Sequence, residues 1–385
     1  MTMRIPLTRP SPVRLSEATD KLREIEDRSI FSNFGPVSDA FEENIIRELF
    51  GGEGECLTLC NATTGLLIAM REVVERHGGG RRRYALMPSF TFAAAAQAAK
   101  WNRLTPLFCD INAVDWSADR ASEQRLLEKY HQEIAVVVPY ATFGYAIDLE
   151  WYEEIQRRYG IPVVVDAAAS LGTVSEDGRG FGTGFSGAVI YSIHVTKPFS
   201  TAEGGLVYSA DPELIQTLRS MSNFGFTEPR NATRMGLNGK MSEVSALLAH
   251  LRLQDFDAVM DRRTQLIRLY RDLLPELFYQ PEQSHRQAHQ FTSTLLPPQM
   301  AEHRTAIRTE MGQRGISSTT YFSPHVAEQG YFRGDADLAS LPVTNGIASR
   351  VLTLPLYDAM TEEEVEQVAV AVQAALAEHT PLLAR

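Results

Sequence analysis

The sequence predicts an α/β protein with a large domain built on a mostly parallel seven-stranded sheet and a smaller C-terminal α+β domain. The chain has 385 residues, which is more than one hydrophobic core usually serves. From about residue 55 to 210, short β-branched runs alternate with amphipathic stretches, and after residue 236 a long helical pattern follows. We therefore expect a large domain over residues 1–240, bridging helices over 241–280 and a small domain over 281–385.

Seven short apolar runs predict the strands of the large domain. The run that ends in Asp166 is almost uniformly apolar, which is typical of a central strand buried on both faces. Its carboxylate is expected at the carboxyl edge of the sheet, where ligands bind in open α/β proteins. The seven runs are 56–59, 84–87, 106–109, 134–138, 162–166, 188–193 and 205–209.

The rest of the chain has a different pattern. Residues 241–277 carry apolar side chains at helical spacing, and neither Gly nor Pro occurs before Pro275, which predicts one long or two abutting helices. A segment rich in Pro, Gln and His follows over 281–290. We then expect a strand over 291–296, a helix over 300–314 and a final helix over 361–379.

Composition narrows the class of protein. With 37 Lys and Arg against 48 Asp and Glu, the formal net charge is −11, which disfavours binding of nucleic acid. The basic run Arg81-Arg82-Arg83 is expected in a solvated loop before a strand. Cys56, Cys60 and Cys109 form neither a disulfide framework nor a metal-binding pattern, so we expect a reducing compartment and no metal. Without a secretion signal or membrane-spanning segment, the expected location is the cytoplasm.

Lys197 is a candidate nucleophile. It follows the apolar run that ends near Ile193, in a turn region before Gly204 and Gly205 and the next strand. Glycines there allow backbone to approach a ligand closely, and a lysine in such a loop can form a Schiff base with an aldehyde. The alternative for a single lysine is an ordinary surface position.

A second feature lies after the first predicted strand. Residues 61–65, Asn-Ala-Thr-Thr-Gly, precede a helix expected over 66–76, so the hydroxyls of Thr63 and Thr64 and free backbone N–H groups lie where a helix binds phosphate. Capping of the helix by Thr63 or Thr64 is the structural alternative, and the two are compatible.

A buried carboxylate, a loop lysine and a phosphate cradle at one sheet edge fit pyridoxal 5′-phosphate. The carboxylate of Asp166 keeps the pyridine nitrogen protonated, and Lys197 holds the aldehyde and moves protons. The ring also needs an apolar cover. Phe90 and Phe92 follow the second strand, and we expect Phe90 in the core and Phe92 over the ring.

The order and spacing of several motifs resemble the DegT/DnrJ/EryC1/StrS sugar aminotransferases, which are fold-type-I pyridoxal-phosphate enzymes. The resemblance covers nearly the whole chain. Its motifs are Asn33-Phe34-Gly35-Pro36 with Phe41-Glu42, Pro88-Ser89-Phe90-Thr91-Phe92, Asp110-Ile111, Val165-Asp166-Ala167-Ala168, Ser192-Ile193-His194-Val195-Thr196-Lys197 with Glu203-Gly204-Gly205, Asn223-Phe224-Gly225, residues 236–243 and residues 350–356.

The resemblance implies a role for each candidate residue. Lys197 forms the covalent link to the cofactor, Asp166 pairs with the pyridine nitrogen and Phe92 covers the ring. The cofactor phosphate is bound by Thr63, Thr64 and Ser192, and by Asn238 of the neighbouring subunit of a homodimer, with Lys240 close by. Tyr321, Phe322 and His325 lie toward the sugar-nucleotide site.

Three positions depart from the family pattern. Ala169 stands where Gln or His is common, so a polar contact to the cofactor ring hydroxyl is missing or supplied elsewhere. Thr63-Thr64-Gly65 replaces the commoner Gly-Thr/Ser-Ala, and Ala202 replaces the Gly before Glu203. After these changes a hydroxyl is still present to bind the cofactor phosphate, but the sequence does not decide which residue donates it.

The implied reaction transfers an amino group from L-glutamate to a keto carbon, C4 or C3, of a nucleotide-linked deoxysugar in amino-sugar and polysaccharide biosynthesis. One alternative is a dehydratase of the same fold, which has His in place of the cofactor lysine, so Lys197 disfavours it. The other is a non-catalytic sensor, for which Ala169 is the one hint. His194 is expected to pack or hydrogen-bond locally.

Overall fold

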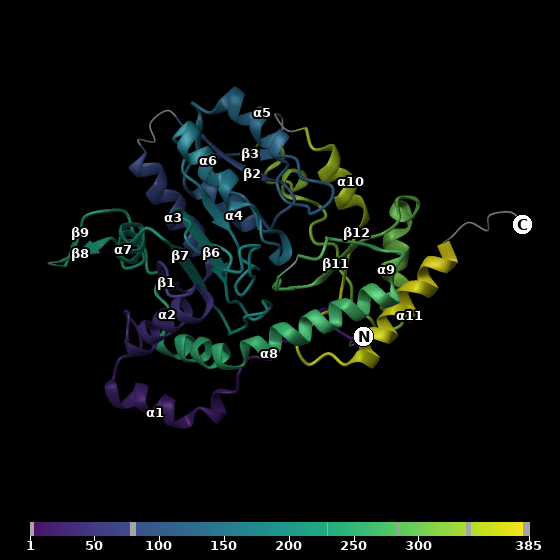
Figure 1. Ribbon diagram of the computed structural model, residues 1–385, viewed down its shortest axis with the longest axis horizontal. Helices are drawn as coiled ribbons and strands as arrows, with labels where there is room; N and C mark the ends of the chain where they lie inside the picture. Colours follow the sequence, from purple (N-terminus) through teal and green to yellow (C-terminus); the bar gives the residue numbers. More distant parts are fainter. Residues whose placement is uncertain (1–3, 78–81, 229, 284, 336–339, 380–385) are drawn as a thin grey trace, which may run out of the picture.

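The computed structural model of the chain describes residues 4–77, 82–228, 230–283, 285–335 and 340–379 (Figure 1). Of the basic run, Arg81 lies outside the described residues, whereas Arg82 and Arg83 directly precede a strand. Among the described residues, no helix combines the length and the apolar character needed to cross a membrane.

All seven predicted runs form strands of the large domain. Strands β3-β2-β4 make one hydrogen-bonded group and β5-β6-β7-β1 the other. Parallel bridges join the groups, between Val137 and Val163 and between Tyr140 and Asp166. β7 runs antiparallel to both of its neighbours, β6 and β1, whereas the other strand pairs are parallel, so the sheet is mostly parallel. The strands are β1 (Glu55–Leu59), β2 (Tyr84–Pro88), β3 (Thr105–Cys109), β4 (Ile134–Val137), β5 (Val164–Asp166), β6 (Ala188–Ser192) and β7 (Gly205–Ser209).

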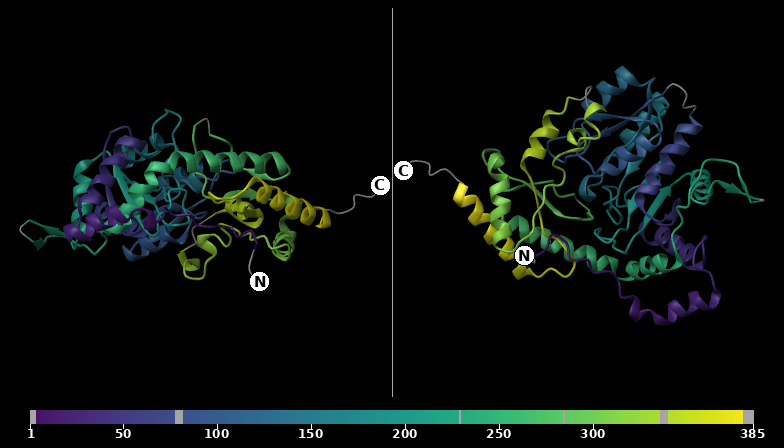
Figure 2. Two further views of the ribbon diagram at one scale, coloured as in Figure 1. Left: turned by 90° about the horizontal axis from the view of Figure 1, so that it is seen from below. Right: turned by 180° about the vertical axis from the view of Figure 1, so that it is seen from behind.

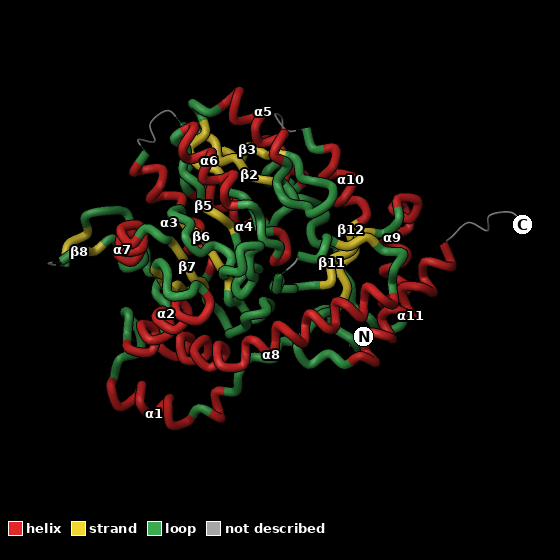
Figure 3. The backbone as a smooth tube through the Cα atoms, viewed as in Figure 1, coloured by secondary structure: helices red, strands yellow, loops and turns green. Residues whose placement is uncertain are grey.

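Helices cover both faces of this sheet (Figure 3). Side chains that alternate along β5 divide between two cores: Val163 and Val165 belong to one, Val164 to the other. This confirms the prediction of a central strand buried on both sides. The first core includes side chains of α2 (Pro36–Leu49), α5 (Arg120–Tyr130) and α6 (Leu149–Tyr159), and the second includes those of α3 (Ala62–Arg76), α4 (Ala93–Trp101) and α7 (Pro212–Met221).

A single long helix, α8 (Glu243–Leu273), joins the two parts of the molecule (Figure 2). It begins at Ser242, whose side chain accepts a hydrogen bond from the Ser245 N–H and so caps the helix. Its N-terminal part packs on α2 and α1 (Thr19–Arg28), and its C-terminal part on α11 (Glu362–His379). The predicted bridge is therefore one helix, because nothing in its sequence interrupts the hydrogen-bond ladder.

The C-terminal part is an α+β domain. Strands β10 (Phe278–Tyr279), β11 (Thr292–Leu295) and β12 (Val351–Leu354) form an antiparallel sheet in that order. The helix expected over 300–314 is a 3₁₀ segment, η3 (Pro298–His303), followed by α9 (Arg304–Gln313). The remaining elements are α10 (Pro342–Arg350), the hairpin of β8 (Phe226–Thr227) and β9 (Asn231–Ala232), and the 3₁₀ turns η1 (Leu15–Glu17), η2 (Thr142–Gly144), η4 (Val326–Glu328) and η5 (Arg333–Asp335).

The expected large domain of residues 1–240 is wrong at its N-terminal end. Ile5 is buried in the hydrophobic core of the C-terminal domain and pairs with Ile316, and the Leu7 carbonyl accepts a hydrogen bond from the Leu356 N–H. Ile5 and Leu7 therefore pack with the C-terminal domain, a contact that only the tertiary structure determines. The hairpin β8–β9 projects away from the sheet (Figure 1).

Candidate active site

Asp166 ends β5 and is 2% exposed. The Ala168 N–H donates a hydrogen bond to its Oδ1 over 3.1 Å. Burial raises the pKa of the Asp166 carboxyl to about 6, although the Ala168 N–H and the charge of Lys197 act against this rise. The side chain of Tyr140 is also buried, and burial together with the charge of Asp166 raises the pKa of its phenol. The acid predicted at the carboxyl edge is thus buried there.

Lys197 lies in the loop between β6 and β7, where its N–H donates to the His194 carbonyl over 2.8 Å. Its Nζ donates to Oε1 of Gln290 over 3.1 Å. Burial lowers the pKa of the Lys197 amine to about 8, and the carboxylate of Asp166 opposes that change. Each charge acts on the other, so the predicted pair lies together, and Lys197 is not an ordinary surface lysine.

Helix α3 begins at Ala62, four residues before the predicted start at Leu66. The prediction of Thr63 or Thr64 as its cap is wrong, because Asn61 is extended and its side chain accepts from the Thr64 N–H over 2.9 Å. Both threonines therefore lie in the first turn. The Thr64 hydroxyl is 3.4 Å from Sγ of Cys60. Among the residues described, the N–H groups of Ala62 and Thr63 have no hydrogen-bond acceptor, which suits a helix end that binds an anion.

The end of β6 meets this helix through a glycine. Ser192 is buried and pairs with Gly205 on β7. A Cβ on Gly205 would lie 2.4 Å from the carbonyl carbon of Asn61 and 2.5 Å from the nitrogen of Ala62, so only glycine allows this approach. The predicted phosphate-binding residues Ser192, Thr63 and Thr64 thus gather at one edge.

The two phenylalanines after β2 have the environments that the sequence predicts. Phe90 is fully buried, with edge-on contacts to Trp116 and Phe143. Phe92 precedes the first residue of α4 and is 60% exposed, so its ring is free to stack on a ligand.

Asn238 and Lys240 form a small polar cluster. The Lys240 amine donates to Oδ1 of Asn238 over 2.9 Å and to Oδ1 of Asn223 over 2.8 Å, and it lies 5.0 Å from the ring centroid of Phe224. Between them, the Gly239 carbonyl accepts from the Cys60 N–H over 2.8 Å. The cluster lies beside the N-terminal turn of α3 in its own chain, and its contribution to a neighbouring subunit stays a prediction.

Tyr321 and Phe322 belong to an aromatic cluster that reaches Asp166. The ring of Phe322 stacks on Phe143 at 5.3 Å and lies 6.0 Å from that of Tyr140, whose backbone pairs with Asp166. The ring of Tyr321 stacks on that of Phe291 at 5.1 Å. These contacts place the two aromatic residues near the predicted site.

His325 is 2% exposed and both of its ring nitrogens have partners. Nδ1 lies 2.7 Å from the Ser89 hydroxyl and Nε2 lies 2.8 Å from Oδ1 of Asn345. The ring therefore joins the loop after β2 to α10. Its expected contact with the sugar nucleotide stays a prediction. His194, as expected, bonds locally, with Nδ1 2.9 Å from the Thr196 hydroxyl.

Sequence reasoning missed Gln290. It is buried, and it reaches Lys197 from a segment 93 residues away. A single glutamine in the Pro, Gln and His-rich segment before β11 belongs to no motif, so only the packing of the two domains reveals it. Ala169, by contrast, is buried and brings no polar group to the site.

The residues present fit pyridoxal 5′-phosphate. A buried carboxylate suits a protonated pyridine nitrogen, and an amine with a pKa of about 8 suits covalent capture of an aldehyde. The uncapped N–H groups at the start of α3 suit a phosphate dianion, and the exposed ring of Phe92 suits the face of a pyridine.

Comparison with known proteins agrees with this chemistry. A putative PLP-dependent aminotransferase from Bacillus cereus has a similar structure, with a TM-score of 0.89, 38% identity and coverage of 96% of this chain and 99% of that chain. Protein Rv3402c of Mycobacterium tuberculosis is 32% identical over 97% of this chain and 90% of its own length. A dTDP-4-amino-4,6-dideoxy-D-glucose transaminase of Escherichia coli is 28% identical over 94% of this chain and 96% of its own length. Because residues 14–373 also match the family as a whole, the chain belongs to the DegT/DnrJ/EryC1/StrS aminotransferase family, whose members depend on pyridoxal phosphate.

Proposed function

We propose that this enzyme transfers an amino group from L-glutamate to the keto carbon, C4 or C3, of a nucleotide-linked deoxysugar. The observation that carries the proposal is the pairing of buried Asp166 with partly buried Lys197 at the carboxyl edge of the sheet, beside the free N–H groups at the start of α3. Support for the substrate class comes from the Escherichia coli relative, whose name specifies a dTDP-linked 4-amino sugar.

The cofactor supplies an electron sink that stabilises negative charge on the carbon next to the transferred nitrogen. Asp166 ionises with a pKa of about 6, so near neutral pH it presents a carboxylate to the ring nitrogen. The proposed phosphate ligands Thr63, Thr64 and Ser192 fix the other end of the cofactor, and Phe92 covers its ring. In a homodimer, Asn238 and Lys240 of the neighbouring subunit add to the phosphate site.

Lys197 has two tasks in this proposal. It would hold the cofactor aldehyde covalently and, once free, would move a proton between the cofactor C4′ and the substrate carbon. An amine with a pKa of about 8 keeps a substantial neutral fraction near neutral pH, so it can accept a proton, and its ammonium form can return one. An ordinary lysine with a pKa of 10.5 would be almost entirely ammonium.

Tyr321 and Phe322 are proposed to face the sugar nucleotide, since they lie in the aromatic cluster that reaches Asp166. The dehydratase alternative is disfavoured because it needs His in place of Lys197. The sensor alternative rests on Ala169 alone, and the paired Asp166 and Lys197 favour catalysis over it.

Absorbance of the purified protein tests the function. We expect a yellow protein whose colour is lost on reduction with borohydride and on addition of L-glutamate alone, and a Lys197→Ala variant that shows neither change. Nucleotide-linked 3-keto and 4-keto sugars are then added separately to the glutamate-treated enzyme. The colour should return only with sugars whose keto group is at one of these two positions. A wild-type spectrum that glutamate leaves unchanged would refute the donor, and failure of every keto sugar would refute the substrate class.

A further inference from the structure

The hydrogen bond between Lys197 and Gln290 joins the two domains at the site. Lys197 belongs to the loop of the large domain, and Gln290 to the segment that enters β11 of the C-terminal domain. We propose that Gln290 is a positioning residue, whose carboxamide oxygen holds the free amine of Lys197 in the orientation from which it captures the cofactor aldehyde. This inference deepens the proposed function, because it takes Lys197 as the cofactor lysine.

The chemistry of the carboxamide suits this task. Its oxygen only accepts hydrogen bonds and carries no charge, so it fixes one N–H of the amine without competing for the lone pair. A carboxylate in the same place would favour the ammonium form, and an apolar side chain would leave the amine without this acceptor. Of the common side chains of this size, glutamine therefore orients the amine and leaves it nucleophilic.

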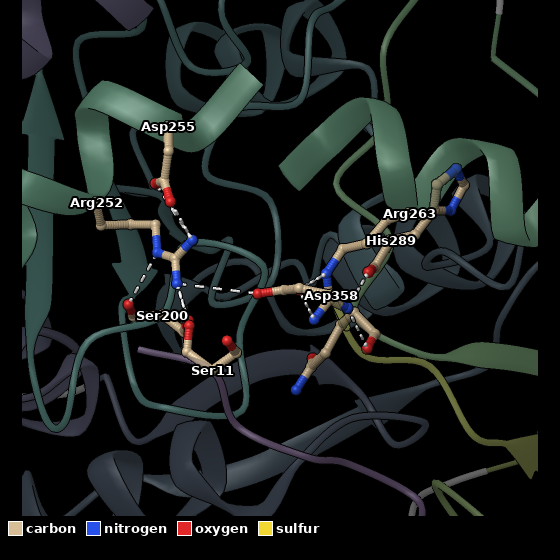
Figure 4. Close-up of polar contacts among 8 residues, drawn as sticks. Ser11, Ser200, Arg252, Asp255, Arg263, His289 and Asp358 are labelled. Carbon is tan, nitrogen blue, oxygen red and sulfur yellow. Dashed lines mark hydrogen bonds and ion pairs between the residues drawn. The ribbon is translucent and has the colours of Figure 1, made fainter. Parts of the chain in front are cut away.

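The backbone of Gln290 is held from α8. The Arg263 side chain donates to the carbonyl of His289 over 3.0 Å and to that of Gln290 over 3.3 Å. Arg263 is itself buried and pairs with Asp358, whose Oδ1 is 2.8 Å from its Nε (Figure 4). Next to Gln290, the stacked rings of Phe291 and Tyr321 hold the other side of the segment.

The loop that carries Lys197 is held by the same helix. The Arg252 side chain, which is buried, donates to the Ser200 carbonyl over 3.3 Å, and its guanidinium lies 3.9 Å from the same Asp358 (Figure 4). Arg252 and Arg263 are 11 residues apart, which is about three helical turns, so both project from one face of α8. The spacing between Lys197 and Gln290 is thus fixed by one helix and one shared carboxylate.

Few other charges act on the amine. Asp166 faces it from β5. On the side of Gln290, Arg263 is engaged with Asp358. Burial, followed by the charges of neighbouring arginines, lowers the pKa of the adjacent His289 to about 3, so that ring is neutral. On the loop of Lys197 itself, His194 bonds to Thr196 and lies 3.5 Å from Glu203. Asp166 is therefore the charged group that acts on the Lys197 amine, and a charge introduced at position 290 should change the pKa of that amine directly.

The test follows capture of pyridoxal 5′-phosphate by the full-length apoprotein as a function of pH. Capture forms a C=N bond with Nζ and releases the aldehyde oxygen as water, and the absorbance change gives its rate constant. In Gln290→Glu we expect the pH midpoint of the rate to rise by about one unit, with a limiting rate near that of wild type, because the acceptor is kept and a charge is added. In Gln290→Leu we expect the midpoint to fall and the limiting rate to drop about tenfold, because orientation is lost.

Matched controls are Gln287→Glu and Gln287→Leu, which change a buried glutamine three residues earlier in the same segment. These should behave as wild type, and thermal unfolding of each apoprotein reports whether it folds. If Gln290→Leu does not fold, Gln290→Glu, which conserves size, still decides the question. Midpoints that stay at the wild-type value, or that shift in the same direction in both Gln290 variants, would overturn the positioning role. A Lys197→Ala variant that captures the cofactor as fast as wild type would instead refute the proposed function.

Discussion

Removal of the Asp166 charge is expected to stabilise the apoprotein above neutral pH. The perturbation is Asp166→Asn, which keeps the size of the side chain and an oxygen for the Ala168 N–H. In the folded chain the pKa of Asp166 is raised from 3.8 to about 6, so the folded state keeps its proton where the unfolded state has lost it. The native protein therefore loses stability as pH rises from about 4 through about 6, and Asn escapes this loss.

The magnitude follows from the size of the pKa change. The rise from 3.8 to about 6 is roughly two units, and each unit corresponds to about 1.4 kcal/mol, so Asp166→Asn should raise the free energy of unfolding by about 3 kcal/mol at pH 8. Near pH 4 the gain should vanish. There the folded wild type keeps the proton on Asp166, so its side chain is as uncharged as the asparagine that replaces it.

Urea unfolding of the apoproteins at pH 8 and at pH 4 measures both values, with circular dichroism as the probe. The control is Asp177→Asn, whose carboxylate is about half exposed and bonded to Arg179, and which should change the free energy of unfolding by less than about 0.5 kcal/mol at pH 8. If Asp166→Asn proves less stable than wild type at pH 8, the inference that burial dominates at Asp166 is refuted. Cofactor affinity should fall in the same variant, because the carboxylate charge that destabilises the folded apoprotein is the charge that would pair with the pyridine nitrogen.

Three further predictions concern packing around the site. Asp358→Asn should lower the free energy of unfolding by about 3 kcal/mol in urea titrations, because it leaves the buried Arg263 without its carboxylate partner. The control Asp255→Asn removes a carboxylate that is 55% exposed and leaves Arg252 within 3.9 Å of Asp358, so it should cost less than about 0.5 kcal/mol. Equal losses in the two variants would contradict this. Phe92→Ala should weaken cofactor binding about tenfold in equilibrium dialysis with little change in thermal unfolding, and an unchanged affinity would count against ring stacking. Gly205→Ala should push the start of α3 away, because the added Cβ has no room there, and should lower the free energy of unfolding by about 2 kcal/mol. It should also weaken cofactor binding, so a variant that binds the cofactor as tightly as wild type would contradict the close approach.

Much of the fold could be predicted because its signals are local. The apolar run before Asp166 indicates a strand buried on both faces, and its first polar residue marks the carboxyl edge. The uninterrupted helical spacing after residue 241 indicates α8. The start of α3 was missed by four residues, because the Thr63 and Thr64 hydroxyls also suit a cap and only backbone conformation selects Asn61.

By itself, the sequence determined the seven strands of the large domain, the long helix α8, the edge of the sheet that carries Asp166 and Lys197, and the family, since these depend on local spacing and on the order of motifs. Only the tertiary structure decided that Gln290 meets Lys197, that Ile5 packs with the C-terminal domain, and that burial moves the pKa values of Asp166 and Lys197 toward neutrality. The reason is physical. Solvent exclusion and contacts between distant segments arise when helices and sheets pack, and no short stretch of sequence encodes them.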